Sequence, residues 1–476
     1  MESKRGIALV SISALLTGLS FNHPQLFFLT WFSLCPFLYV LSRSTKKASI
    51  LNAFIFGAIY YFTIIFWVAN VTILGLIFLL GYLCLYPVMF SFLARYFFKK
   101  RFAIVTIASV WVLLELLKEN IWCGFSWGNI GYSQYLNRYI IQIADIFGVK
   151  SISFLVVMVN VLFFEIISKN KNIIKKLFFV ASVLFFCTAY SHYKLNTFIT
   201  SGEVTLSLVQ PNVGESEKYN LSSGSNIVAR LKKLSRQTEE GSLVIFPEAA
   251  WPFVIKDDDR QILPEFVAEI KRRSLIGLIQ HDGKFHNRAS LFNSSGKLVA
   301  FYDKLKLVPF GEYVPLRKYL SFIPVINSIG DMHRGREIVV FPYGDQKFSV
   351  LICFEDIFSD LVRDFSSESD FLINITNDAW FMGEPQASQH LAIMVFRAIE
   401  NRISIARCAN TGISGWVSFK GDINKLKKQN SEVFFEGVMN FKLPLNDQRS
   451  FFNAYGGMVS FLYVFLLGLG FIHHEE

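Results

Sequence analysis

The sequence predicts a multi-span α-helical membrane bundle joined to an α/β domain. Of the 476 residues, 52% are hydrophobic and the mean hydropathy is +0.39, which is too apolar for an ordinary water-soluble protein. Apolar stretches near the length of a membrane span, about 20 residues, recur over roughly the first 200 positions. From about residue 203 to 445, short β-branched runs alternate with helical patterns instead, which indicates layered α/β structure.

Eight apolar stretches predict eight transmembrane helices, seven before the polar domain and one after it. They cover approximately residues 6–21, 25–42, 49–69, 73–94, 102–117, 151–168, 177–192 and 455–472. We therefore expect three parts: residues 1–200 with seven transmembrane helices, residues 201–450 as the polar domain, and residues 451–476 as the last helix with a short tail.

The net charge of +10 comes entirely from the membrane part. Residues 1–200 hold 17 Lys+Arg and 5 Asp+Glu, which leaves 47 − 17 = 30 and 37 − 5 = 32 for the remainder. The basic residues gather before the first stretch and in every second connection, as at Arg43, Lys46 and Lys47. By the positive-inside rule both termini are expected in the cytoplasm and the polar domain outside it. This placement explains the charge without a nucleic-acid partner.

The six cysteines do not form a metal or disulfide pattern. They are Cys35, Cys84, Cys123, Cys187, Cys353 and Cys408. No CxxC pair or Cys/His ligand spacing occurs, so we expect no metal and no cofactor. Cys408 is best interpreted as a buried strand residue.

Three predicted strands of the polar domain end in residues that together could perform acyl transfer. Glu248 follows the run Leu243–Phe246, Lys304 follows Val299–Tyr302, and Cys353 follows Ser349–Ile352. A cysteine thiol attacks as the thiolate, so it needs a base to take its proton and a cation to stabilise the oxyanion. If the strand ends lie side by side, the three side chains supply these roles. For any one of them alone, a core cysteine or a solvated charge is the simpler interpretation.

The motifs around these residues resemble those of the nitrilase, or carbon-nitrogen hydrolase, superfamily, and in particular its membrane branch, the apolipoprotein N-acyltransferase family. The segments that carry the resemblance are Phe246-Pro247-Glu248, Tyr302-Asp303-Lys304, Val308-Pro309-Phe310-Gly311-Glu312-Tyr313-Val314-Pro315, Ile352-Cys353-Phe354-Glu355 and Asn377-Asp378-Ala379-Trp380-Phe381. The resemblance implies a nitrilase-like αββα sandwich, which periodicity alone does not distinguish from a doubly wound sheet.

The resemblance also implies a two-step reaction in the bacterial inner membrane, with the catalytic domain on the periplasmic side. Cys353 would take a fatty acyl chain from a phospholipid, with phosphatidylethanolamine expected, and pass it to the α-amino group of a diacylglyceryl-cysteine on an apolipoprotein. Glu248 would be the general base and Lys304 the oxyanion partner. Glu312 and Glu355 would support them.

Two positions depart from the family pattern. Phe354 follows the nucleophile where a tyrosine is usual, and Tyr219 stands where a tryptophan is often found. Substrate-binding candidates are Tyr219, Trp251, Trp380 and Phe381, although the last three could equally be core residues. The apolar stretch 310–331 suggests a lid.

Two other functions remain open from the sequence. One is a membrane-anchored amidase that hydrolyses a small amide, and the other is a non-catalytic lipoprotein-binding protein, for which Cys353→Ser would be harmless. Whichever function is correct, we expect a monomer, because the helical bundle and the polar domain are self-sufficient.

Overall fold

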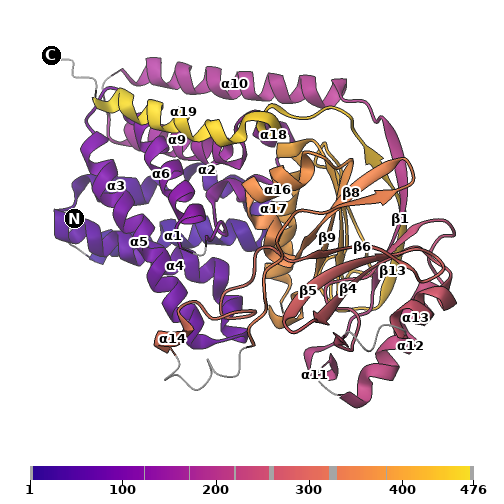
Figure 1. Ribbon diagram of the computed structural model, residues 1–476. Coiled ribbons are helices and arrows are strands. Elements are labelled where there is room, and N and C mark those ends of the chain that lie inside the picture. Colours follow the sequence, from indigo (N-terminus) through magenta and orange to yellow (C-terminus); the bar gives the residue numbers. More distant parts are fainter. Residues whose placement is uncertain are drawn as a thin grey trace. The chain divides into compact units, whose positions relative to one another are not determined.

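The computed structural model describes residues 4–122, 124–170, 172–218, 221–256, 262–320, 330–381 and 383–471. The chain divides into two compact units (Figure 1). The membrane unit takes the described residues up to Phe198 and again from Ser450 onward, and the α/β unit takes those from Ile199 to Arg449.

The membrane unit is entirely helical in its regular structure. Its α-helices are α1 (Lys4–Asn22), α2 (Thr30–Ser33), α3 (Cys35–Arg43), α4 (Lys46–Ile65), α5 (Ile73–Phe97), α6 (Ala103–Asn120), α7 (Arg138–Ile141), α8 (Ala144–Phe147), α9 (Val149–Ile167), α10 (Ile173–Thr197), α18 (Phe451–Tyr455) and α19 (Val459–Gly468). Short 3₁₀ segments adjoin α2, α4 and α19, including Pro24–Leu29 before α2 and Phe66–Asn70 after α4.

Seven helical segments of the described chain are long and apolar enough to cross a membrane. They are Lys4–Asn22, Pro24–Arg43, Lys46–Asn70, Ile73–Phe97, Val149–Ile167, Ile173–Thr197 and Phe451–Phe471. Each overlaps a predicted span. The remaining prediction, 102–117, is helix α6, which is not in this set because Glu115, Lys118 and Glu119 interrupt its apolar character.

The charges of α6 have partners inside the membrane unit. Glu115 Oε1 accepts hydrogen bonds from Trp111 Nε1 at 3.0 Å and from the Ile130 backbone N–H at 2.8 Å. Lys118 Nζ donates to the Trp127 carbonyl oxygen at 2.8 Å. Charged groups in an apolar surrounding require such partners. Helix α6 is therefore an interior helix, and an eighth span at this position remains a prediction.

The α/β unit contains two β-sheets. The first has seven strands, with β13-β1-β2-β4-β5-β6 in that order and β3 paired to β4, and the second has six in the order β12-β11-β10-β9-β8-β7. The strands are β1 (Gly202–Gln210), β2 (Leu243–Ile245), β3 (Ile255–Lys256), β4 (Ser274–His281), β5 (Phe285–Phe292), β6 (Leu298–Asp303), β7 (Val340–Tyr343), β8 (Gln346–Ile352), β9 (Phe371–Thr376), β10 (Ser404–Ala409), β11 (Gly415–Val417), β12 (Ile423–Lys425) and β13 (Gly437–Leu445).

Each sheet has a parallel centre and antiparallel strands toward its edges. In the first sheet β1, β2 and β4 are parallel, and in the second β8, β9 and β10 are parallel. The sheets face each other, because Cys408 Sγ on β10 donates to the carbonyl oxygens of Val209 on β1 and Ile245 beside it on β2, at 3.3 and 3.2 Å.

The helices of this unit are α11 (Glu215–Lys218), α12 (Gly224–Ser235), α13 (Ile262–Ile270), α14 (Arg317–Leu320), α16 (Ser359–Ser366) and α17 (Glu384–Asn401). Four of them, α12, α13, α16 and α17, cover the outer faces of the sheets. Ile227, Leu231 and Leu234 of α12 recur at helical spacing and pack with α13 against the first sheet. Helices α16 and α17 pack against the second sheet (Figure 1). The expected α/β domain with its αββα layers is thus confirmed.

Candidate active site

Cys353 stands where strand β8 ends. The strand residues Val350 to Ile352 are fully buried, and Cys353 has φ of 56°, in the left-handed region. A non-glycine residue adopts this conformation at a cost of about 1–2 kcal/mol. A 3₁₀ turn, Cys353–Ile357, follows immediately. The backbone reversal ends the strand, so Cys353 lies at the carboxyl end of β8.

Glu248 is held at the corresponding end of β2 by three donors. Its Oε1 accepts hydrogen bonds from Asn287 Nδ2 at 2.7 Å and Lys304 Nζ at 3.1 Å, and its Oε2 accepts one from the Asn377 backbone N–H at 2.8 Å. Gly277 on β4 permits this placement, since a Cβ there would come within 2.3 Å of the Pro247 carbonyl oxygen. The carboxylate is therefore fixed in position and 7% exposed.

Lys304 follows β6 and joins two carboxylates. Its Nζ donates to Glu248 Oε1 at 3.1 Å and to Glu312 Oε1 at 2.9 Å, and the side chain is only 1% exposed. Glu312 is fixed in turn, because its Oε2 accepts the Val308 backbone N–H at 2.8 Å. One ammonium between two carboxylates leaves this group with a net negative charge.

Asn287 on β5 is a member of this cluster that sequence reasoning missed. Its Nδ2 donates to Glu248 and, at 2.8 Å, to Glu312 Oε1, so it bridges the same two carboxylates as Lys304. Its Oδ1 is buried and has no hydrogen-bond partner among the described residues. The sequence around it gives no motif, and only the pairing of β5 with β6 brings it to the site.

Burial and charge set the protonation of the cluster. Burial raises the pKa of the Cys353 thiol and the Glu248 carboxylate raises it further, which outweighs the opposite effect of Lys304. Burial lowers the pKa of Lys304, but Glu248 and Glu312 outweigh it and hold that pKa well above its usual value. At neutral pH these shifts favour a thiol at Cys353 and an ammonium at Lys304.

Glu355 lies in the same 3₁₀ turn as Cys353 and is fully buried. Its Oε1 accepts hydrogen bonds from Tyr302 Oη at 2.8 Å and from the backbone N–H groups of Leu305 and Lys306 at 2.8 and 3.0 Å. Its Oε2 accepts the Ile352 N–H at 2.8 Å. Burial raises the pKa of Glu355 to about 7 in spite of these donors. Glu355 thus ties the end of β8 to the end of β6, where Cys353 and Lys304 are placed.

A second buried network lies behind Cys353. The Cys353 carbonyl oxygen accepts a hydrogen bond from Asn374 Nδ2 at 2.9 Å, and Asn374 Oδ1 accepts one from Arg407 Nη1 at 2.6 Å. Arg407, itself fully buried, also pairs with Asp378 at 3.0 Å and Asp356 at 3.4 Å. This network holds the backbone of Cys353 in its left-handed conformation.

Two parts of the chain match known domains. Residues 13–162 match the apolipoprotein N-acyltransferase N-terminal domain, and residues 205–436 match carbon-nitrogen hydrolase. A Geobacter metallireducens protein named apolipoprotein N-acyltransferase is 32% identical over 485 residues, covering 95% of this chain and 92% of that protein. The chain belongs to the apolipoprotein N-acyltransferase family.

Another member of the apolipoprotein N-acyltransferase family, from Haemophilus influenzae, is 29% identical over 492 residues, covering 94% of this chain and 90% of that protein. Among solved structures, an amidase from Nesterenkonia sp. is similar at 18% identity and a TM-score of 0.38, covering 52% of this chain and 93% of the amidase. The family resemblance inferred from the motifs is confirmed.

The other residues expected in an apolipoprotein N-acyltransferase site lie in different surroundings. Phe354 lies beside the cluster, with its ring centroid 5.7 Å from Lys304 Nζ. Trp251 is 2% exposed and packs against Phe266 in the core between the first sheet and its helices, in line with the core interpretation. Trp380, in contrast, is 46% exposed.

The expectations for Phe381, Tyr219 and the lid have mixed outcomes. Phe381 is half-buried in the 3₁₀ turn Asp378–Phe381. Tyr219 lies outside the described residues, and so does the stretch 321–329 of the predicted lid. Both stay predictions.

Proposed function

We propose that this chain N-acylates apolipoproteins through a thioester on Cys353, with a membrane phospholipid as the acyl donor. The observation that carries the proposal is the cluster itself: a fixed carboxylate, an ammonium shared between two carboxylates, and a cysteine in a strained turn at the same edge of the α/β unit. These groups provide a base, an oxyanion partner and a nucleophile.

In the first step, Cys353 Sγ attacks the ester carbonyl carbon of the phospholipid while Glu248 takes the thiol proton. Lys304 uses two of its three N–H donors on Glu248 and Glu312, so the third can stabilise the oxyanion. The tetrahedral intermediate then breaks its bond to the glycerol oxygen. That oxygen leaves with the proton from Glu248, so the products are a thioester on Cys353 and a lysophospholipid.

In the second step, the α-amino group of a diacylglyceryl-cysteine attacks the thioester carbonyl carbon. Glu248 accepts a proton from the amine as the new C–N bond forms. The C–S bond breaks, and the Cys353 thiolate takes up that proton. Because the raised pKa of Cys353 favours the thiol, regeneration of the resting enzyme is favourable.

We also propose that the protein lies in the bacterial inner membrane with the α/β unit on the periplasmic side. The alternating basic connections support this orientation.

A monomer is expected because one chain supplies the base, the cation and the nucleophile. Light scattering of the purified protein in detergent would test this expectation. Glu312 is assigned to orient Lys304, and Glu355 to position the ends of β6 and β8.

Intact-protein mass spectrometry tests the proposal directly. Purified wild type, Cys353→Ser and a control, Cys187→Ser in helix α10, are incubated with phosphatidylethanolamine and no acceptor. Wild type and the control should gain the mass of one fatty acyl chain, and Cys353→Ser should gain none. Adding a diacylglyceryl peptide with a free α-amine should then discharge the adduct and produce an N-acylated peptide.

Two outcomes would contradict the proposal. If no protein forms an adduct while the lipid stays intact, the phospholipid is not the donor, and a small amide becomes the substrate to examine. If water discharges the adduct as fast as the amine does, the protein is a hydrolase.

A further inference from the structure

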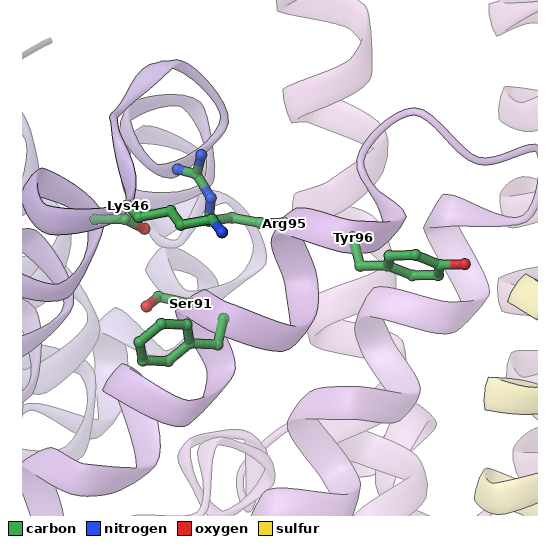
Figure 2. Close-up of a pocket in the computed structure, with 6 residues that line it drawn as sticks. Lys46, Ser91, Arg95 and Tyr96 are labelled. Carbon is green, nitrogen blue, oxygen red and sulfur yellow. The ribbon is translucent and has the colours of Figure 1, made fainter.

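A cavity of about 300 Å³ opens where the start of helix α4 meets the end of helix α5. It is lined by Lys46, Ser49, Ser91, Phe92, Arg95 and Tyr96, and Figure 2 shows the side chains of Lys46 and Arg95 extending toward each other. All six belong to the membrane unit, whereas the proposed reaction uses residues of the α/β unit. The cavity is therefore not part of the acyl-transfer site.

Two cations line this cavity without an acidic partner. None of the six lining residues is acidic, and among the described residues no carboxylate is paired with Lys46 or Arg95. Arg95 Nη1 donates to the carbonyl oxygens of Leu41 at 3.0 Å and Ser44 at 2.5 Å, which fixes the guanidinium at the end of α3. Its Nη2 and Nε donors remain for a ligand. Two unpaired cations lining one cavity favour an anion in it.

Ser49 adds an unused hydrogen-bond donor to the same cavity. It lies in the first turn of the 20-residue helix α4 and is 1% exposed, yet its Oγ has no hydrogen-bond partner among the described residues. A buried hydroxyl without a partner costs roughly 1–3 kcal/mol. The positive end of the α4 dipole lies at the same place. An anion with oxygen acceptors, such as a phosphate group, accounts for both the unpaired Ser49 hydroxyl and the helix dipole.

The rest of the cavity wall indicates that the phosphate belongs to a lipid. Phe92 and Tyr96 are 51% and 50% exposed, and Met89 and Leu93 continue the exposed apolar surface of α5 toward its middle. A free phosphate ion would gain nothing from this surface. A phospholipid places its phosphate between the cations and its acyl chains along α5, which satisfies the polar and apolar parts of the site together.

We propose that this cavity binds the phosphate group of an anionic phospholipid, with Lys46, Arg95 and Ser49 as its donors. The bound lipid fills the space between α4 and α5 and neutralises the charges of Lys46 and Arg95. Its headgroup lies at the end of the bundle that the basic connections predict to be cytoplasmic. The anionic lipid is thus a structural ligand and not the acyl donor.

Native mass spectrometry of the full-length protein in detergent tests this site. Dioleoyl-phosphatidylglycerol is titrated into wild type, Lys46→Gln, Ser49→Ala and the control Lys47→Gln. Lys47 is the exposed neighbour of Lys46 and does not line the cavity. One phosphatidylglycerol should bind to wild type and to the control with equal affinity. Each cavity variant should bind it at least about tenfold more weakly, because each loses a hydrogen bond to a charged phosphate.

A second measurement separates folding from binding. Because Ser49 Oγ has no protein partner, Ser49→Ala should not lower the unfolding temperature in lipid-free detergent. It should reduce the rise in that temperature that phosphatidylglycerol produces in wild type.

Three results would overturn the proposal. In the first, Lys46→Gln and Lys47→Gln bind phosphatidylglycerol equally. In the second, zwitterionic dioleoyl-phosphatidylcholine binds as tightly as phosphatidylglycerol. In the third, inorganic phosphate displaces the lipid at an equal concentration, which would identify a site for the free ion.

Discussion

Replacing Arg407 by methionine should destabilise the α/β unit strongly, because it removes the cation at the centre of a buried network. Arg407 is 0% exposed and pairs with Asp378 and Asp356, which are 4% and 0% exposed. It also donates to His390 Nδ1 at 2.7 Å and to Asn374 Oδ1 at 2.6 Å. Breaking a buried ion pair by removing one partner typically costs about 3–5 kcal/mol.

That free energy converts into a large change in unfolding temperature. For a domain of about 150–250 residues, 1 kcal/mol shifts the midpoint by about 2–4 °C, so we expect a fall of roughly 6–20 °C. The matched control is Arg363→Met on helix α16. Arg363 pairs at 2.7 Å with Asp360, which is 65% exposed, and such surface pairs contribute about 0–1 kcal/mol. The control should therefore shift the midpoint by no more than about 4 °C.

Alkylation of Cys408 after a brief heat pulse measures the unfolding of this unit, with peptide mass spectrometry to identify the labelled residue. Cys408 follows Arg407 on β10 and is fully buried. Neighbouring residues of a strand point to opposite faces, so its thiol lies between the two sheets and the substitution does not itself uncover it. The midpoint is the temperature at which half of Cys408 is labelled.

The difference in unfolding midpoint between wild type and Arg407→Met should become smaller as the pH falls from 8 to 5. Burial raises the pKa of Asp378, but Arg407 and His390 outweigh it, so that pKa lies well below its usual value in the wild type. In the wild type the ionised Asp378 carboxylate therefore stabilises the fold at every pH above the pKa that Asp378 has in the unfolded chain. This contribution is lost only in stronger acid. Without Arg407 the pKa of Asp378 rises, and proton uptake then stabilises the variant. An Arg407→Met midpoint no lower than that of Arg363→Met at pH 8 would refute this reasoning.

Two further substitutions test the site. Asn287→Ala should slow acyl-enzyme formation by about 10- to 100-fold, because Glu248 and Glu312 each lose a hydrogen bond to a charged oxygen. Intact-mass measurements at timed intervals after adding phosphatidylethanolamine would show the slower acylation. Unchanged acylation would exclude Asn287 from the site. Burial raises the pKa of Glu355 to about 7. The folded protein therefore holds this proton more tightly than the unfolded one, and the contribution of Glu355 to stability should fall as the pH rises from about 4.5 to 7. The unfolding midpoint of wild type minus that of Glu355→Gln should decline across that pH range. A constant difference would contradict the raised pKa of Glu355.

The parts of the fold predicted from sequence are those that depend on local pattern. Apolar runs of membrane length identified every segment of the membrane unit that is long and apolar enough to cross a bilayer. Polar residues at strand ends likewise indicated Glu248, Lys304 and Cys353. Glu248 and Lys304 follow β2 and β6 of the first sheet and are hydrogen-bonded to each other, whereas Cys353 follows β8 of the second sheet. The group therefore depends on the two sheets facing each other, which no strand pattern specifies.

The parts that were missed depend on contacts between distant segments. Strand β13 pairs with β1 in an antiparallel register that joins Gly202 to Leu445, and no local signal specifies a partner so far along the chain. Asn287 is similar. It lies between His286 and Arg288 in a half-polar strand, so its neighbours suggest a solvated edge. The register with β6 instead turns its side chain to the carboxylates of Glu248 and Glu312.

A charged residue inside an apolar run is the sequence signal that predicts such contacts, although it does not name the partner. Arg407 interrupts the buried strand Ser404–Ala409, and Glu115 interrupts helix α6. In both places the side chain is buried and hydrogen-bonded: Arg407 to Asp378, and Glu115 to Trp111. Burial of an unpaired charge costs several kcal/mol, so the position alone implies that a polar partner exists. Which residue it is follows only from the packing of the elements.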